Sequence, residues 1–397
     1  MRIIVQDYPG HPFQVQLSRE LARRGHEVLH IYAGYNQTPR GDLITRRDDP
    51  VTFSVRPVYI HQPLDKYSLI KRWFQEREYG TLVQKEIKAF RPDVVISANT
   101  PLDAQAIILK ECHRYRIKFI FWVQDIIGIA VQRILKAKFH LLGLIIGEHY
   151  KRLERKLLRN SNNIVIISPD FQPLLLNWGI NHHKINIIPN WAPLEIISDR
   201  PKGNSWAEQM GVADKFCFLY SGTLGMKHNP ELLLRLALFF KESLDTCVVV
   251  ISEGPGANWL IEQREIHKLD NLLVLPFQPM EQYADVLASG DVLVTILEPD
   301  AGIFSVPSKV LSYLCAKRPQ LLAVPEENLA AKIVLNNEAG IVVNPLHKTA
   351  FLEAAKILYG HPSKRLFFAE NGYLYAKNNF NIEKIGDSFE RIILEAH

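Results

Sequence analysis

The chain has 397 residues, of which 47% are hydrophobic and 22% charged, and its formal net charge is +5 at pH 7. This length exceeds one typical hydrophobic core and predicts two domains of an ordinary folded protein. With so modest a charge and no Cys/His metal cluster or Walker loop, the sequence predicts neither nucleic acid nor a metal ion as a partner. No run reaches the roughly 18 uninterrupted apolar residues of a membrane span.

The N-terminus enters a strand pattern at once, at Arg2–Val5, so we expect no secretory signal and a cytoplasmic protein. The cysteines stand far apart in the sequence within apolar segments: Cys112, Cys217, Cys247 and Cys315. This usage predicts buried thiols in a reducing compartment, and no spacing among them is that of metal ligands.

Short apolar runs alternate with amphipathic helical stretches over almost the whole chain. In the first half the predicted strands are Ile3–Val5, Glu27–Tyr32, Val94–Ser97, Lys118–Val123, Ile164–Ser168 and Ile185–Ile188. In the second half they are Phe216–Ser221, Cys247–Ser252, Leu272–Leu275, Val292–Ile296, Leu321–Val324 and Gly340–Val343. The predicted helices include Phe13–Arg24, Leu102–Tyr115, Pro230–Phe240, Gln282–Ser289, Thr349–Leu358, Arg365–Lys377 and Ile382–Ala396. This alternation predicts an α/β protein with two Rossmann-like domains, each a parallel sheet covered by helices on both faces.

The predicted boundary between the domains follows Asn190, where a stretch rich in Pro, Gly, Asn and charge begins. We therefore expect residues 1–190, joined by a returning C-terminal helix at about 378–397, to form the acceptor-side domain. Residues 191–377 form the second domain. Ligands of such sheets bind beyond the carboxyl ends of strands, so we expect a central cleft lined by the loops that follow strands in both domains.

In the first half, three such loops carry candidate binding residues. Gly10 and His11 follow the first strand, where Gly10 would let a substrate approach the backbone and His11 would make a polar contact. Asn99 follows the strand Val94–Ser97. Asp125 follows another strand end as the most isolated carboxylate near the expected cleft, and it is either a catalytic or orienting group or an ordinary cap.

In the second half, the loop of residues 221–229 combines glycines with cationic side chains. Gly222 permits close backbone approach, Thr223 follows it, and Lys227 and His228 can reach a negatively charged group. A plain strand-to-helix turn is the alternative.

Two further loops in this half carry weaker signals. Residues 252–256, with Glu253, Gly254 and Pro255, form a second glycine-rich loop, although such loops are also common turns. The segment that begins at Glu298 and ends at Gly302 brings carboxylates that would hold sugar hydroxyls or simply face solvent.

The most informative segment is Pro307-Ser308-Lys309, between the strand Val292–Ile296 and a short helix. Ser308 stands where a side chain can cap free backbone N–H groups. Lys309 lies in the first turn, where cations are normally disfavoured by the helix dipole. A lysine at this position suggests a phosphate held between the lysine and the helix, with a solvated lysine on an ordinary loop as the alternative.

Basic residues flank the apolar stretch Phe139–Ile146, and residues 66–74 form a second basic-aromatic segment. The basic residues of the first segment are Arg133, Lys136, Lys138, Lys151, Arg152, Arg155, Lys156 and Arg159. We expect both segments to contact an anionic membrane surface at the inner face of the cell membrane, with an amphipathic core helix as the alternative.

Several motifs, in this order, resemble glycosyltransferase family 4, the retaining enzymes of the GT-B fold. The quoted segments are Arg24-Gly25-His26-Glu27-Val28, Ile188-Pro189-Asn190, Tyr220–Gly225, Glu253–Gly256 and Pro307-Ser308-Lys309. The last resembles the "P-S-K" subgroup that occurs in exopolysaccharide and O-antigen synthesis of the colanic-acid type.

The resemblance implies a metal-independent hexosyltransferase that needs no cofactor. Its co-substrate would be a UDP- or GDP-linked sugar and its acceptor a glycan or lipid-linked sugar. We expect catalytic roles for Asp125, Lys227 and Lys309. We expect acceptor contacts from Gly10, His11 and Asn99, and donor contacts from the other candidate residues of the second half. Three positions depart from the family pattern, because Thr223, Phe304 and Ser312 stand where the family usually has an Arg and two Glu. A nucleotide-sugar epimerase of similar fold, or a catalytically silent nucleotide-binding scaffold, is therefore an alternative.

Overall fold

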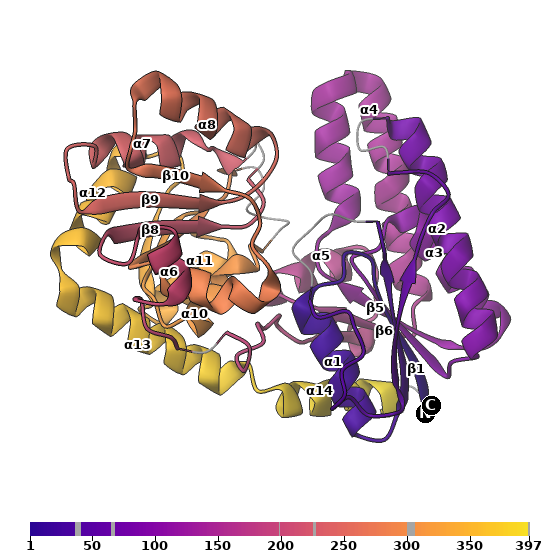
Figure 1. The fold of residues 1–397 in the computed structure, drawn as a ribbon. Coiled ribbons are helices and arrows are strands. Elements are labelled where there is room, and N and C mark those ends of the chain that lie inside the picture. The colour runs from indigo at the N-terminus through magenta and orange to yellow at the C-terminus, as the bar shows by residue number, and fades with distance from the viewer. Residues whose placement is uncertain (36–40, 65–67, 198, 225–227, 300–305, 396–397) are drawn as a thin grey trace. The chain divides into compact units, whose positions relative to one another are not determined.

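The computed structural model describes the chain except for residues 36–40, 65–67, 198, 225–227, 300–305 and 396–397. The chain divides into two compact units: Met1–Asn190 with Ile382–His397 form unit 1, and Trp191–Asn381 form unit 2. Each unit is a parallel sheet with helices packed against it (Figure 1). The predicted α/β class with two Rossmann-like sheets is confirmed.

Unit 1 is built on a seven-stranded parallel sheet in the order β3-β2-β1-β4-β5-β6-β7. Its strands are β1 (Arg2–Asp7), β2 (Glu27–Ala33), β3 (Phe53–Val58), β4 (Val94–Ala98), β5 (Lys118–Val123), β6 (Asn163–Ile166) and β7 (Ile185–Ile187). Its helices are α1 (Pro12–Arg23), α2 (Leu69–Phe90), α3 (Leu102–Arg114), α4 (Ile127–Asn160), α5 (Gln172–Asn177) and α14 (Ile382–Glu395). The central strands are buried on both faces, which explains their continuous apolar sequences.

The C-terminal helix α14 belongs to unit 1 and packs beside α1 (Figure 1). The ring of Phe389 is fully buried and meets the ring of Trp122 edge-on, with 4.7 Å between centroids. At the rim of this contact, the guanidinium of Arg24 donates to Asp387 at 2.7 Å and to Glu390 at 2.9 Å. The last residues of the chain therefore complete the first unit through both apolar and ionic contacts.

Unit 2 is built on a six-stranded parallel sheet in the order β10-β9-β8-β11-β12-β13. Its strands are β8 (Phe216–Ser221), β9 (Thr246–Ile251), β10 (Leu272–Leu275), β11 (Val292–Ile296), β12 (Gln320–Ala323) and β13 (Gly340–Val343). Its helices are α6 (Ser205–Gln209), α7 (Glu231–Phe239), α8 (Pro255–His267), α9 (Tyr283–Ala288), α10 (Lys309–Cys315), α11 (Leu329–Asn336), α12 (Lys348–Gly360) and α13 (Pro362–Asn379). One face of this sheet packs on α7 and α12 to form a hydrophobic core.

The strand order of each sheet reverses direction at one place, which determines where a ligand crevice forms. In unit 1 the reversal lies between β1 and β4, and in unit 2 between β8 and β11. Loops that leave two such strands in opposite directions open a crevice at the carboxyl edge of the sheet. The topology therefore places the loops after β1 and β4, and those after β8 and β11, at the candidate sites.

Two features of unit 1 differ from the sequence prediction. The edge strand β3 was not expected, because Arg56 and Pro57 interrupt its apolar pattern and its side chains are partly exposed. The 34-residue helix α4 is not straight, because Phe139 and His140 leave helical geometry and the chain turns back on itself (Figure 1). Gly143 and Gly147 let the two arms approach closely, because a Cβ atom would lie 1.9 Å from the Leu135 carbonyl oxygen or 2.5 Å from Gln132 Cα. Among the described residues, no helix is long and apolar enough to span a bilayer.

Candidate functional site

The reversal point of unit 2 brings Lys309, at the start of α10, against the loop that follows β8. The Nζ atom of Lys309 lies 3.5 Å from the centroid of the Tyr220 ring. A Cβ atom added to Gly222 would lie 3.0 Å from both Nζ and Cε of Lys309. Gly222 also has φ +131°, a backbone conformation that other residues rarely adopt. Glycine at position 222 is therefore required both by the backbone and by the lysine beside it.

The charge of Lys309 is incompletely balanced by the protein. Burial lowers the pKa of its ammonium well below the ordinary lysine value. No carboxylate pairs with it in the part of the chain that the structure describes. The face of Tyr220 offers only a weak cation–π attraction. An anion bound beside Lys309 would favour the charged ammonium, so this position is suited to a phosphate.

Two tyrosine hydroxyls fix the backbone of the loop after β8. The hydroxyl of Tyr313 accepts a hydrogen bond from the Ser221 N–H at 2.9 Å and donates to the Ser221 carbonyl at 3.1 Å. The hydroxyl of Tyr220 donates to the Thr223 carbonyl at 2.7 Å. Burial raises the pKa of both tyrosines, so they remain neutral donors at physiological pH. The tyrosines of α10 and β8 thus fix the backbone of this loop.

The glycine-rich loop after β9 packs directly on the loop after β8. A Cβ atom at Gly256 would come within 2.3 Å of the Leu224 carbonyl oxygen. Gly254 takes φ +100° as the residue before α8, and Pro255 begins that helix. Glu253 points elsewhere, because its carboxylate accepts a hydrogen bond from the Phe277 N–H at 3.2 Å. The structure therefore brings Gly222, Thr223, Gly254 and Pro255 to one edge of the sheet and gives Glu253 a structural partner.

The remaining predicted site residues of unit 2 lie in the loops after β8 and β11 and at the start of α10. Ser308 precedes α10 as expected, but its exposed side chain makes no capping hydrogen bond. The predicted cap is therefore wrong, because the backbone of Ser308 is already helical and directs its hydroxyl away from the free N–H groups. His228 and Glu298 are partly buried in loops after β8 and β11. Lys227 and Gly302 lie outside the described residues, as does Phe304.

The reversal point of unit 1 gathers His11, Asn99 and the buried carboxylate of Asp7. His11 Nδ1 lies 3.5 Å from Asp7 Oδ1 and 3.3 Å from Asn99 Nδ2. Burial by itself would lower the pKa of His11, but the carboxylates of Asp7 and, more weakly, Asp125 raise it above the ordinary value. The arrangement therefore favours a cationic imidazole beside the first loop. Asp7 begins the candidate loop that follows the first predicted strand, but no role was predicted for its carboxylate.

Gly10 is used differently from the prediction. It has φ +81°, and a Cβ atom there would lie 2.7 Å from Leu43 Cδ1. Its carbonyl accepts a hydrogen bond from the Gly41 N–H at 2.9 Å. Residues 41–43 of the protein therefore fill the space beside Gly10 that the sequence prediction gave to a substrate.

Asp125 is partly buried, and the buried carboxylate of Glu154 lies near enough to feel its charge. Glu154, on the second arm of α4, accepts hydrogen bonds from the N–H groups of Ile127 at 3.0 Å and Gly128 at 2.8 Å. Burial raises the pKa of Glu154 to about 8, and the nearby Asp125 adds to the increase. Glu154 thus holds the start of α4, two residues after Asp125, as a largely neutral acid. No sequence signal singles it out, since it stands 29 residues away in an ordinary basic helix.

The chain was compared with protein families and with solved structures. Residues 14–196 match the family described as Glycosyltransferase Family 4. The chain is similar to sucrose-phosphate synthase from Thermosynechococcus elongatus, with 14% identity, a TM-score of 0.78, and coverage of 100% of this chain and 98% of that one. It is also similar to HepE from Anabaena in complex with UDP-glucose, with 14% identity, a TM-score of 0.72 and 99% coverage of both chains.

A third similar structure is WaaG, a glycosyltransferase involved in lipopolysaccharide biosynthesis, with 16% identity, a TM-score of 0.71, and coverage of 99% of this chain and 100% of that one. No curated protein matches the sequence. The match of residues 14–196 agrees with the predicted family, and the similar structures show that the chain has the GT-B fold. The "P-S-K" subgroup stays a prediction.

Proposed function

We propose that the chain is a retaining hexosyltransferase that moves a sugar from a UDP- or GDP-linked donor to a glycan or lipid-linked acceptor in cell-surface polysaccharide synthesis. The family match supports sugar transfer. The similar structures support the finer statement, because HepE was solved with UDP-glucose and WaaG acts in lipopolysaccharide biosynthesis.

The observation that carries the proposal is the partly buried Lys309, which pairs with no carboxylate among the described residues and lies against Gly222 at the reversal point of the unit 2 sheet. A nucleotide diphosphate is the anion that this position fits, since its oxygens would meet the ammonium and the backbone of the fixed loop at residues 221–223. Lys227 and His228 would add positive charge from the same loop. Thr223, Gly254, Pro255 and Ser308 would line the donor, and Glu298 and Gly302 would contact its sugar.

The proposed reaction needs no metal ion. As the bond between sugar and diphosphate breaks, negative charge develops on the leaving phosphate, and preorganised cations with backbone N–H groups stabilise it. The acceptor hydroxyl attacks the same face of the sugar and gives its proton to a phosphate oxygen, so the anomeric configuration is kept. In unit 1, Asp125 would orient the acceptor, and His11 and Asn99, with the loop at Gly10, would bind it.

Turnover with a defined donor tests this proposal. The full chain is incubated with UDP-glucose or GDP-mannose and a lipid-linked oligosaccharide fraction, in the presence of EDTA, and nucleotide release and product anomer are followed by NMR. We expect nucleotide release only when the acceptor is present, with retention at the anomeric carbon. Isomerised sugar nucleotide without acceptor would support the epimerase instead. Nucleotide binding without turnover under any of these conditions would support the catalytically silent scaffold.

We also propose that the bend of α4 contacts an anionic membrane, where a lipid-linked acceptor is held. Four apolar side chains around the bend are 60–72% exposed: Ile134, Leu141, Leu142 and Ile145. Arg133 and Lys136 lie on the first arm beside them. An exposed apolar tip with adjacent cations is typical of a surface that enters the headgroup region. Farther along the second arm, Lys151 and Arg152 contribute less charge, because both pair with Glu148.

Co-sedimentation with vesicles tests the membrane contact. We expect the protein to bind phosphatidylglycerol vesicles, and the variant Leu141→Ser with Leu142→Ser to lose this binding. A matched control replaces two exposed apolar residues of unit 2, Leu244→Ser with Ile266→Ser, which are 94% and 67% exposed. Equal binding by all three proteins, or none by the unmodified chain, would contradict this part of the proposal.

A further inference from the structure

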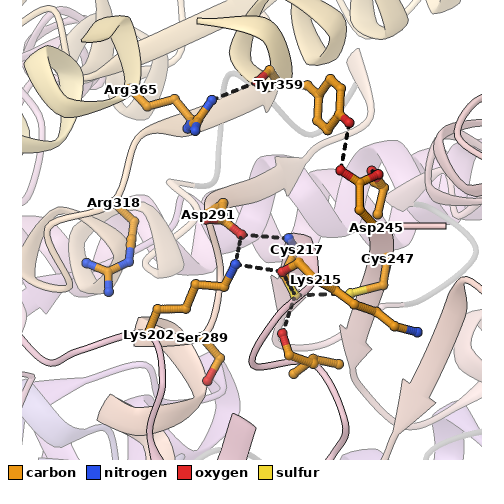
Figure 2. Close-up of polar contacts among 12 residues, drawn as sticks. Lys202, Lys215, Cys217, Asp245, Cys247, Ser289, Asp291, Arg318, Tyr359 and Arg365 are labelled. Carbon is orange, nitrogen blue, oxygen red and sulfur yellow. Dashed lines mark hydrogen bonds and ion pairs between the residues drawn. The ribbon is translucent and has the colours of Figure 1, made fainter. Parts of the chain in front are cut away.

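Two of the four cysteines, 30 positions apart in the sequence, meet inside unit 2. Cys217 on β8 and Cys247 on β9 are register partners in the parallel sheet. Their Sγ atoms lie 3.0 Å apart, and both residues are buried (Figure 2). Neighbouring strands are about 4.8 Å apart, and aligned Cα atoms at that spacing fall within the range that a disulfide spans. No backbone movement is therefore needed to join the two sulfurs.

The surroundings of the two sulfurs make them chemically different. Cys217 Sγ lies 3.2 Å from the Lys215 carbonyl oxygen, which can only accept a hydrogen bond. The hydrogen bond from Cys217 lowers the pKa of Cys247, and the cations of Lys215 and Lys202 lower it further against the effect of burial. The pKa of Cys217 is raised by the same contact. These contacts favour Cys247 as the attacking sulfur and Cys217 as its partner.

A network of polar contacts fixes this end of the sheet. Lys202 Nζ donates to Asp291 and to the Lys215 carbonyl, each at 2.6 Å, and Asp291 also accepts from the Cys217 N–H at 2.7 Å (Figure 2). The pair is nevertheless close to solvent, because Asp245, two residues before Cys247, is exposed and Lys202 is partly exposed.

We propose that Cys217 and Cys247 form a reversible redox pair that hydrogen peroxide converts into a disulfide between β8 and β9. The Cys247 thiolate attacks one peroxide oxygen, so that an S–O bond forms, the O–O bond breaks and hydroxide leaves to become water. Cys217 then attacks the sulfur of the Cys247 sulfenic acid, so that the S–S bond forms and the S–O bond breaks, releasing a second water with the Cys217 proton. Two thiols are oxidised and one peroxide is reduced.

The proposed pair lies at the amino end of β8, whereas Gly222 follows the carboxyl end of that strand. The redox site is therefore distinct from the proposed phosphate site. The two remaining cysteines serve as internal controls, because Cys112 and Cys315 are buried and burial raises the pKa of both.

Mass spectrometry of the full chain tests the redox pair. Reduced protein is treated with stoichiometric hydrogen peroxide, denatured in N-ethylmaleimide and mapped by peptides. We expect a Cys217–Cys247 disulfide, two alkylated cysteines at positions 112 and 315, and reversal by dithiothreitol. The variant Cys112→Ser with Cys315→Ser should form the same disulfide. Full alkylation of Cys217 and Cys247 after peroxide would overturn the proposal, as would a disulfide that involves Cys112 or Cys315.

Single variants test the assigned roles. In Cys217→Ser, the sulfenic acid of Cys247 has no resolving thiol, so dimedone should trap it. In Cys247→Ser, Cys217 should remain a thiol and give no dimedone adduct. Cys217→Ala and Cys247→Ala, with circular dichroism as a check of folding, replace any serine variant that does not fold. Dimedone labelling of Cys217 rather than Cys247 would overturn the assigned roles.

Discussion

The ammonium of Lys309 lies 3.5 Å from the centroid of the Tyr220 ring and is held there by a loop in which position 222 must be glycine. Burial lowers the pKa of the Lys309 ammonium, and a phosphate beside it would raise that pKa. This contact joins the sequence motif at residues 307–309 to the loop after β8.

Replacing Gly256 by alanine should destabilise unit 2 without touching a proposed ligand. The new Cβ atom would meet the Leu224 carbonyl oxygen at 2.3 Å, and backbone atoms cannot move aside cheaply. We expect a loss of about 1–3 kcal/mol in the free energy of unfolding, measured by urea denaturation. Gly203→Ala is the control, since nothing lies within 4 Å of its added Cβ atom. Equal stability of the two variants would refute the close packing.

Replacing Tyr313 by phenylalanine should loosen the loop after β8. The variant removes both hydrogen bonds to Ser221 and leaves its buried N–H without that partner. We expect a loss of about 1–3 kcal/mol in unfolding free energy. Tyr115→Phe, at an exposed position, should be nearly neutral. A Tyr313 variant as stable as the Tyr115 variant would show that the hydroxyl does not support the loop.

Glu154 should make stability depend on pH in a predictable direction. Its pKa in the folded chain is about 8, against a model-compound value of 4.5, so the folded state binds the extra proton between these values. The stabilisation is therefore fully present below about 4.5 and is lost as pH rises through about 8.

The variant Glu154→Gln isolates this effect. The difference in unfolding free energy between the unmodified chain and the variant should shift by on the order of a few kcal/mol from pH 5 to pH 9, with the unmodified chain losing stability. A difference that stays constant with pH would contradict the raised pKa.

His11 should titrate above its ordinary pKa because of Asp7. We expect NMR titration of the His11 ring to give a pKa higher than the 6.5 of a free histidine, and Asp7→Asn to lower it. The control is Asp93→Asn, which lies at the opposite end of the sheet, before β4. A His11 pKa that does not respond to Asp7→Asn would contradict the prediction that Asp7 favours a cationic imidazole at His11.

Much of the fold follows from sequence because buried parallel strands have continuous apolar patterns. Central strands such as Lys118–Val123 are recognisable for this reason, whereas the edge strand β3 is not, because half of its side chains face solvent. The bend lies at Phe139 and His140, and neither of these residues is the glycine or proline that usually marks a kink in a sequence. It depends instead on packing between the two arms of α4.

The candidate site could be predicted as a set of loops but not as a set of contacts. Strand ends show which loops meet at one edge of a sheet, so Gly222 and Lys309 could be grouped beforehand. The burial of Lys309, the pairing of Asp7 with His11 and the register of Cys217 with Cys247 depend on tertiary packing. The roles of the loop residues in binding and catalysis remain predictions.

Calorimetric titration with UDP and GDP tests the central claim most directly. The unmodified chain is compared with Lys309→Met and with the control Lys356→Met, which replaces an exposed lysine on α12. We predict that Lys309→Met binds the nucleotide about 10- to 100-fold more weakly, because a charged hydrogen-bond partner of the diphosphate is lost, while Lys356→Met binds normally. Equal affinity of all three proteins, or no nucleotide binding by the unmodified chain, would contradict the account.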